Sequence, residues 1–381
     1  MERRLQMWKI EIPQRSIDIH ESRVGGPIVK ALTRLAEGEP ITWAIGGSKV
    51  DRDKRIHERD VQLSQLKDIN AKQYFRRILE CFTRNRLVVA RPVELLDFTK
   101  EELKWRDSLW RTAGDSVKNA CHRVISRIFN YDAFVRGCFP VCADNGLIKW
   151  AVCDRRNAQW SAWHFIDSLN VRYCPYCNAE TVGNAALKTR DGGIKLHQSE
   201  LDHFIPHEKY PLLSLSLYNL VPSCSRCNSR FKLAYDIVPG YMRDGVIPIL
   251  NPYVENIHDL VRFEYAPRSI SSLFPLKGNA NNPIKLYAES GVRKDQAEEY
   301  LREFHIGEVY RDFYDEELAT NIRIAALYSP TMRRALNKKY KGITSEEIDK
   351  VLFRASSDPR QINKSRFAKA IIDLQDSLPC Y

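Results

Sequence analysis

The sequence predicts an α+β fold: a mostly helical chain with a small core of strands and a helix near its middle, braced by a zinc ion on four cysteines. Three observations predict it. Apolar residues recur at helical spacing on both sides of the middle of the chain. Short strand-like segments and turn signals fill the middle itself. Two Cys-x-x-Cys pairs bracket those segments, at a spacing typical of structural zinc sites.

Length and composition set the broad limits. The chain has 381 residues, of which 44% are hydrophobic, and a net charge of +11. At about 150 residues per domain, this length predicts two or three domains. Excess positive charge favours a polyanionic partner, because neutralising phosphates releases counterions; a solvated basic surface is the alternative. No apolar run approaches the about 20 residues that cross a bilayer, and no signal peptide is visible. We therefore expect a cytoplasmic protein with no membrane partner.

The first third of the chain changes from irregular to helical. Residues 10–13 and 41–45 are strand-like, and the pairs Gly25-Gly26 and Gly46-Gly47 are turn signals. The charged run 51–60 predicts a solvated helix face or loop. From about residue 70 the apolar residues follow a helical period, and the same holds over 115–137.

The rest of the chain predicts a helix before the cysteine pairs, the segment that carries them, and further helices after it. A helix is predicted over 159–170, before the first cysteine pair, and a Pro- and Asn-punctuated connector over 247–260. Residues 290–381 predict several helices, with a capping box at Thr344 and Glu347 and a helix start at Asp358-Pro359. We therefore divide the chain into a mixed, largely helical domain (1–155), a central domain (156–250) and a C-terminal helical region (251–381).

The two cysteine pairs predict a closed zinc site. Cys174 and Cys177 form the first pair, and Cys224 and Cys227 the second. A two-residue gap lets both sulfurs of a pair reach one ion from a tight turn, and four thiolates complete a tetrahedral shell. A structural ion is therefore expected, because no ligand position is left open for water. The long gap between the pairs, 224 − 177 = 47 residues, must enclose a subdomain.

The enclosed segment predicts strands followed by a helix. Asp191-Gly192-Gly193 marks a hairpin turn. A short strand over 199–204 follows, ending in Asp202-His203, then a loop, a second strand around 218–221 and a helix from about 224 to 232.

This block resembles the ββα-metal core of the HNH endonuclease family, in its zinc-braced form. His203, Asn219 and Asn228 match the three motif positions, and the Asn at the third makes it the H-N-N variety. Asp202 before the histidine and the Cys-x-x-Cys-Asn ending are also typical of zinc-braced members. The resemblance covers about 60 of the 381 residues.

The resemblance implies a catalytic site. His203 would be the general base that deprotonates water, a role that a neutral imidazole suits near pH 7. Asp202 and Asn228 would hold a Mg²⁺ or Mn²⁺ ion, and Asn219 would fix the loop and orient the histidine. The substrate that the family implies is DNA. Four basic side chains on or near the motif are candidate phosphate contacts or else solvated charges: Arg226, Arg230, Lys232 and Lys209.

Other functions remain open at this point. A zinc-braced nucleic-acid-binding module without catalysis would keep the cysteines but would have no use for Asp202, His203 and Asn228. An RNA-cleaving nuclease of the same family is another alternative. The sequence of the block also resembles HNH proteins that act with an ATPase subunit in bacterial anti-phage systems such as Septu. This resemblance implies a role in antiviral defence with an ATPase partner. Cleavage specificity and oligomeric state cannot be read from the sequence.

Overall fold

The computed structural model describes residues 9–377, except 44–55, 58, 62, 153–159, 189, 191–193, 234, 266–283, 341, 356–361 and 363. Within that part of the chain, the fold is mostly helical α+β with several small sheets, as predicted.

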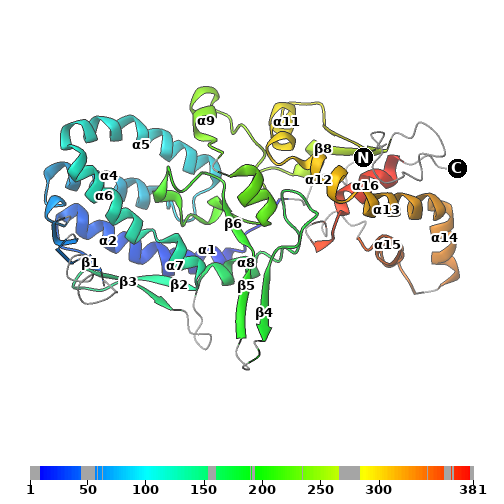
Figure 1. Cartoon of the computed structure of the whole chain (residues 1–381), viewed down its shortest axis with the longest axis horizontal. Coiled ribbons are helices and arrows are strands. Elements are labelled where there is room, and N and C mark those ends of the chain that lie inside the picture. Colours follow the sequence, from blue (N-terminus) through cyan, green and yellow to red (C-terminus); the bar gives the residue numbers. More distant parts are fainter. Residues whose placement is uncertain are drawn as a thin grey trace.

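A group of helices forms the N-terminal part of the molecule, in blue and cyan in Figure 1. Helix α4 buries Tyr74, Phe75, Ile78 and Phe82, whose spacing predicted it, and α2 packs along it. The helices are α1 (Gln14–His20), the π-helical η1 (Glu21–Gly25), α2 (Gly26–Glu37), α4 (Ile69–Arg84), α5 (Pro92–Ala113), α6 (Asp115–Ile128) and α7 (Tyr131–Val135).

A three-stranded sheet accompanies these helices. Its strands are β1 (Thr42–Trp43), β2 (Cys138–Cys142) and β3 (Leu147–Val152), in the order β1-β3-β2. β3 pairs in parallel with β1 and antiparallel with β2. β1 confirms part of the strand predicted over 41–45, and the rest of that segment lies outside the described residues.

The middle of the chain holds the predicted strands and helix. Two antiparallel strands, β4 (Asn184–Lys188) and β5 (Ile194–Gln198), project from the body of the molecule as a hairpin (Figure 1). Its predicted turn at 191–193 lies outside the described residues. The other elements here are α8 (Ala162–Ser168), β6 (Glu200–His203), the 3-10 turns η2 (Pro211–Leu213) and η3 (Leu217–Asn219), β7 (Leu220–Ser223) and the π-helical η4 (Arg226–Lys232).

The C-terminal part is helical, as predicted, and holds one more strand pair. The capping box at Thr344 and Glu347 is present, while Asp358-Pro359 lies outside the described residues. Its elements are α10 (Ile257–Leu260), β8 (Val261–Tyr265), β9 (Ile284–Ala288), α11 (Lys294–Glu303), α12 (Ile306–Phe313), α13 (Asp315–Leu327), α14 (Pro330–Lys339), α15 (Ser345–Phe353) and α16 (Ala368–Ser377), and α9 (Val238–Asp244) precedes them at the end of the central part.

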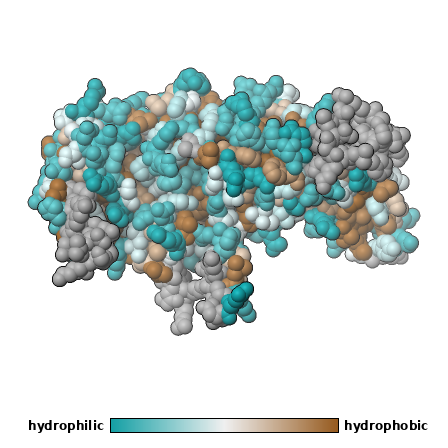
Figure 2. All heavy atoms as spheres, in the orientation of Figure 1, coloured by the Kyte–Doolittle hydropathy of each residue, from teal (hydrophilic) through white to brown (hydrophobic). Residues whose placement is uncertain are grey.

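One hydrophobic core runs through all three parts, from Ile10 to Leu374. The domain boundaries therefore stay a prediction. In the view of Figure 2, hydrophilic residues cover most of the described surface, and apolar ones form small separate patches. Among the described helices, none combines the length and apolar character that a membrane crossing requires.

Two local predictions for the N-terminal segment were wrong. The pair Gly25-Gly26 is no turn but a continuous helical passage from η1 into α2. A Cβ on Gly25 would meet Val88 at 2.8 Å, so glycine allows the close approach of the helix to Val88. Residues 10–13 form no strand: the Ile10 amide donates to the Pro252 carbonyl, and α1 begins directly after Pro13. Gly46-Gly47 lies wholly outside the described residues, and the charged run 51–60 lies largely outside them.

A buried histidine connects the N-terminal helices to the central loop. His20, at the end of α1, is fully buried. Its Nε2 donates to the Leu215 carbonyl at 2.7 Å, and its Nδ1 accepts from the Trp160 indole at 2.7 Å. Burial lowers the pKa of His20 from 6.5 to about 4. The folded protein therefore keeps this ring neutral under conditions that protonate it in the unfolded chain.

This difference predicts acid sensitivity. As pH falls from 6.5 towards 4, the unfolded chain binds a proton at His20 that the folded protein does not, so up to about 3 kcal/mol of stability should be lost. His20→Gln keeps one donor and one acceptor but does not titrate, so its free energy of unfolding should fall less between pH 7 and pH 4.5. Denaturant unfolding measures this, with the exposed His197→Gln as the control. Equal losses in His20→Gln and the unsubstituted protein would contradict it.

Candidate functional site

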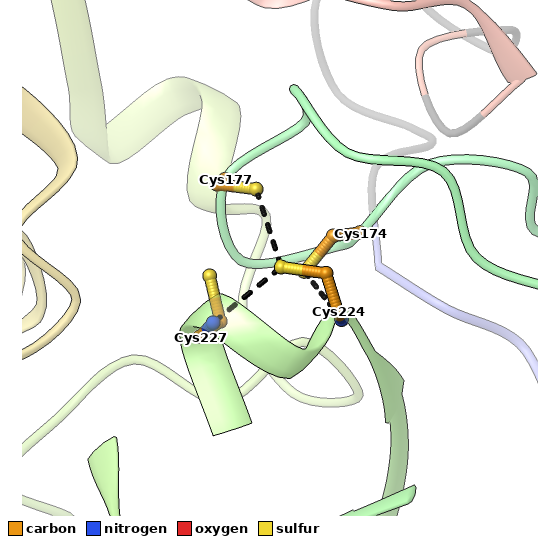
Figure 3. A group of neighbouring side chains, drawn as sticks. All are labelled: Cys174, Cys177, Cys224 and Cys227. Atoms are coloured by element: carbon orange, nitrogen blue, oxygen red, sulfur yellow. Dashed lines mark hydrogen bonds between the residues drawn. The ribbon is translucent and has the colours of Figure 1, made fainter. Parts of the chain in front are cut away.

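Four buried cysteines form one cluster that can hold a structural zinc ion. Cys174 and Cys177 lie on a loop, Cys224 at the end of β7 and Cys227 on η4, with their sulfurs turned toward one another (Figure 3). The four sulfurs lie within 4.8 Å of one another, and those of Cys177 and Cys224 are 3.9 Å apart. A tetrahedral site with Zn–S bonds of about 2.3 Å has sulfurs about 3.8 Å apart, so the donor set fits zinc.

The C-terminal helices support the zinc loop. The Tyr300 hydroxyl on α11 donates to the Tyr176 carbonyl, and the Tyr310 hydroxyl on α12 donates to the Cys177 carbonyl at 2.7 Å. The Asn178 side chain donates to the Ile362 carbonyl at 2.9 Å. The C-terminal region therefore has a structural role that its sequence did not specify.

His203 is held in one tautomer. It ends β6 and is 7% exposed, and its Nε2 lies 3.0 Å from the Ser214 carbonyl oxygen. A carbonyl only accepts, so Nε2 carries the proton and Nδ1 keeps its lone pair. Burial, and then the neighbouring His207, hold the pKa of His203 well below its ordinary value, so the ring is neutral near pH 7. Its ring packs against those of Tyr131 and His207, with centroids 4.3 and 4.1 Å away.

Asn219 fixes the ends of the loop that carries Ser214. It is fully buried in the turn η3, and β7 begins at Leu220, two residues later than the strand predicted around 218–221. Its Oδ1 accepts from the Ile205 amide at 2.7 Å. Its Nδ2 donates to the carbonyls of Ile205 and Leu213, at 3.0 and 3.1 Å. These contacts hold the chain after His203 next to the residue that precedes Ser214.

Asp202 is paired with a buried lysine. Its Oδ1 lies 3.0 Å from the Lys232 ammonium, and its Oδ2 accepts from the Tyr176 hydroxyl at 2.6 Å. Lys232 also donates to the His203 carbonyl at 2.8 Å, and both charged side chains are almost fully buried. The expectation of a surface position for Lys232 was therefore wrong: its ammonium neutralises the carboxylate beside the histidine.

Asn228 has other partners than Asp202. It lies on η4, where its Nδ2 donates to the Glu200 carboxylate at 2.8 Å, and the Ser229 hydroxyl donates to the same oxygen at 2.5 Å. Glu200 and Asp202 are two residues apart on β6, so both lie on the same face of the strand. Carboxylate and amide oxygens suit a hard divalent cation. The structure, however, sets the ammonium of Lys232 against Asp202, and the predicted metal site stays a prediction.

The remaining basic candidates lie nearer the surface. Arg226 pairs with Glu180 at 3.2 Å and lies over the Phe313 ring, 4.0 Å from its centroid. Arg226 and the exposed Arg230 line an open cleft of about 900 Å³ between η4 and the β4-β5 hairpin. Lys209 is exposed and pairs with Asp236 at 3.0 Å. Two arginines thus face one cleft, and Lys209 does not line it.

Three site residues were missed from the sequence. Tyr131 packs on His203 and donates to the Leu201 carbonyl at 3.0 Å, yet it lies 72 positions before the histidine and belongs to no motif. Tyr176 and Glu200 do have a sequence signal. Tyr176 stands inside the first cysteine pair, and Glu200 precedes Asp202 by two positions, as residues on one face of a strand must.

Comparisons with protein-family models, with curated proteins and with solved structures found no match to this chain.

The cysteine cluster makes a clear prediction. Cys224→Ser removes one of four thiolates, so the purified variant should carry little zinc, and its free energy of unfolding should fall by several kcal/mol, because zinc binding contributes to folding. Metal analysis and denaturant unfolding measure both. Cys138→Ser, at a half-buried thiol on β2 outside the cluster, is the control and should keep its zinc. Full zinc content in Cys224→Ser would contradict the site.

The buried ion pair between Asp202 and Lys232 makes a second prediction. Lys232→Met keeps much of the side-chain volume but leaves the Asp202 charge buried without its partner, so the free energy of unfolding should fall by about 3–5 kcal/mol. Arg230→Met, an exposed change two positions earlier, should alter it by no more than about 0.5 kcal/mol. Equal effects of the two substitutions would show that the pair does not hold Asp202 and η4 together.

Proposed function

We propose that this chain is an endonuclease of the HNH type that hydrolyses phosphodiester bonds in DNA, with His203 as its general base. The observation that carries the proposal is the hydrogen bond from His203 Nε2 to the Ser214 carbonyl. It leaves Nδ1 unprotonated on a ring that burial keeps neutral near pH 7. A fixed, neutral imidazole is what proton abstraction from water requires.

The surroundings of the ring support the same role. Asn219 and the Ser214 carbonyl fix the loop and the tautomer, and Tyr131 packs on the ring. A positioned base gains rate because the reacting atoms need no further ordering in the transition state. Asn219, the residue predicted to orient His203, therefore contacts both ends of the loop that carries Ser214.

A cation would supply the second half of the chemistry. A Mg²⁺ or Mn²⁺ ion on the oxygens of Asp202 and Asn228 would polarise the phosphate and stabilise the leaving oxygen. Such an ion would share Asp202 with Lys232, which lies 3.0 Å from one carboxylate oxygen. The ammonium of Lys232 is itself a positive charge beside the base, and it donates to the His203 carbonyl.

Charge and shape support a nucleic-acid substrate, and the choice of DNA over RNA rests on the resemblance. The chain carries a net charge of +11, and Arg226 and Arg230 line the cleft of about 900 Å³ beside η4. Phosphate contacts position a nucleic acid without reading its sequence, so this cleft fits backbone binding. An ATPase partner and a role in antiviral defence stay predictions from the resemblance.

A specific observation also favours a second function, a zinc-braced nucleic-acid-binding module without catalysis. Asp202 is almost fully buried and is neutralised by Lys232 within the protein. An acid that is already paired needs no metal ion, and this arrangement would serve a purely structural brace as well as a catalytic one. The two functions differ in whether His203 matters for more than folding.

A cleavage assay separates the two functions. Purified protein is incubated with supercoiled plasmid DNA and Mg²⁺ or Mn²⁺, and nicking is followed on a gel, with EDTA as the metal-free control. His203→Ala should lower the rate by at least about 100-fold, because it removes the general base. His57→Ala, at an exposed histidine of the N-terminal part that lines neither the cleft nor the surroundings of His203, should cut at the unsubstituted rate. Circular dichroism and zinc content must match in all three proteins.

Two other outcomes of this assay would contradict the proposal. Cleavage by His203→Ala at the unsubstituted rate would show that another group is the base. A folded, zinc-containing protein that binds DNA but cuts it with neither metal would support the binding module.

A further inference from the structure

A cavity of about 360 Å³ lies beside His203, on the side of the N-terminal helices. Helices α5 and α6 form one wall, and the loop from His207 to Ser214 forms the other. Tyr131 and His207 line the cavity and also pack on the His203 ring, while Ser214 lines it and holds His203 Nε2. The cavity therefore shares three residues with the immediate surroundings of the candidate base.

The walls of the cavity carry flat rings. Tyr131, His122 and two residues of the loop, His207 and Tyr210, all line it. Aromatic rings of this kind are the surfaces on which unstacked nucleobases bind. A volume of about 360 Å³ is at the small end of ligand pockets, which run from about 300 to 1,000 Å³. It suits a single flat base better than a nucleotide chain.

A buried polar pair supplies the recognition groups. Glu102 on α5 lines the cavity and is only 4% exposed, and burial raises the pKa of its carboxyl to about 7. Arg106, one helical turn later, also lines it and donates to Glu102 at 3.0 Å. An acceptor and a planar donor group therefore lie side by side in the same wall.

We propose that this cavity binds one unstacked base of the substrate next to the scissile phosphate, and that the base is guanine. The inference rests on the proposed nuclease function. Guanine presents two adjacent donors, N1–H and the N2 amino group, beside the acceptor O6. The ionised form of Glu102, which the adjacent Arg106 favours, accepts from the two donors, and the Arg106 guanidinium donates to O6. Cytosine and adenine would turn a ring nitrogen acceptor toward the carboxylate, and thymine offers a single donor.

Two other ligand classes fit the cavity less well. Glu102, Asp132 and Glu208 line it beside Arg106 and Lys209, so the cavity offers a phosphate group no excess of positive charge. A metal ion is not favoured either. In the part of the chain that the structure describes, Cys174, Cys177, Cys224 and Cys227 form the one group of three or more His, Cys, Asp or Glu side chains close enough to share an ion, and this group lies outside the cavity.

Binding of short DNA strands tests the proposal. A fluorescein-labelled oligothymidine with one central guanine is compared with the same strand containing thymine, adenine or hypoxanthine there, by fluorescence anisotropy. The full-length protein is used with its zinc and without added Mg²⁺ or Mn²⁺, so the strands stay uncut. We expect the guanine strand to bind at least about tenfold more tightly than the others. Hypoxanthine lacks the amino group that Glu102 would bind.

Paired variants assign the effect to the cavity. Glu102→Gln should abolish the preference for guanine, whereas Glu101→Gln, the same change at the exposed neighbour on α5, should keep it. If Glu102→Gln does not fold, the hypoxanthine strand decides the matter with the unsubstituted protein. Equal affinity for all four strands, or a preference that survives Glu102→Gln, would overturn the proposal.

The binding readout is independent of cleavage. A guanine preference without plasmid nicking would leave the base pocket standing and refute the nuclease. Nicking without any base preference would support the nuclease and refute the base pocket.

Discussion

Closure of the four-cysteine cluster is the constraint on which the central part of the molecule depends. It joins two segments that are 47 residues apart in the chain. A zinc ion on the cluster would neutralise the four thiolates, which otherwise repel one another, and would so contribute to folding. The cluster lies next to the candidate site. Tyr176, between the first two cysteines, donates to Asp202, and Lys232, on η4 with Cys227, pairs with the same carboxylate. The cysteine cluster and the position of Asp202 are thus parts of one structure.

Periodicity and spacing predicted the elements well where local sequence decides the structure. The helix around Phe75 and the capping box at Thr344 follow from residues a few positions apart, and so does the strand that ends at His203. The cysteine pairs could be read as one cluster because metal coordination leaves few alternatives for four thiolates. The turn predicted at Gly25-Gly26 was wrong for a non-local reason. Glycine is needed there because Val88 packs closely against the helix, and a local turn signal does not contain that contact.

At the candidate site, too, local sequence predicted some features, and contacts between distant residues decided the others. His203 and Asn219 could be named from the sequence because they match the motif positions of the family that the block resembles. The partners that give them their properties could not. The carbonyl of Ser214 has no side-chain signature, and Tyr131 reaches the histidine from the N-terminal helices. Lys232 was misplaced because a lysine near the surface and one buried against a carboxylate look alike in sequence. Burial and pairing are properties of the whole fold, so local patterns do not carry them.

The hydrogen bond between His20 and Leu215 spans 195 positions, and that between Asn178 and Ile362 spans 184. These contacts tie the central loop to the beginning of the chain and the zinc loop to its end. A ribosome makes the chain from its N-terminus, so the residues around 362 leave it well after those of the central part. Until then, the supports of the central part are incomplete on the nascent chain. Contacts of such length also slow folding, because much of the chain must be ordered before they can form. A protein built in this way completes its central part only after most of the chain has been made.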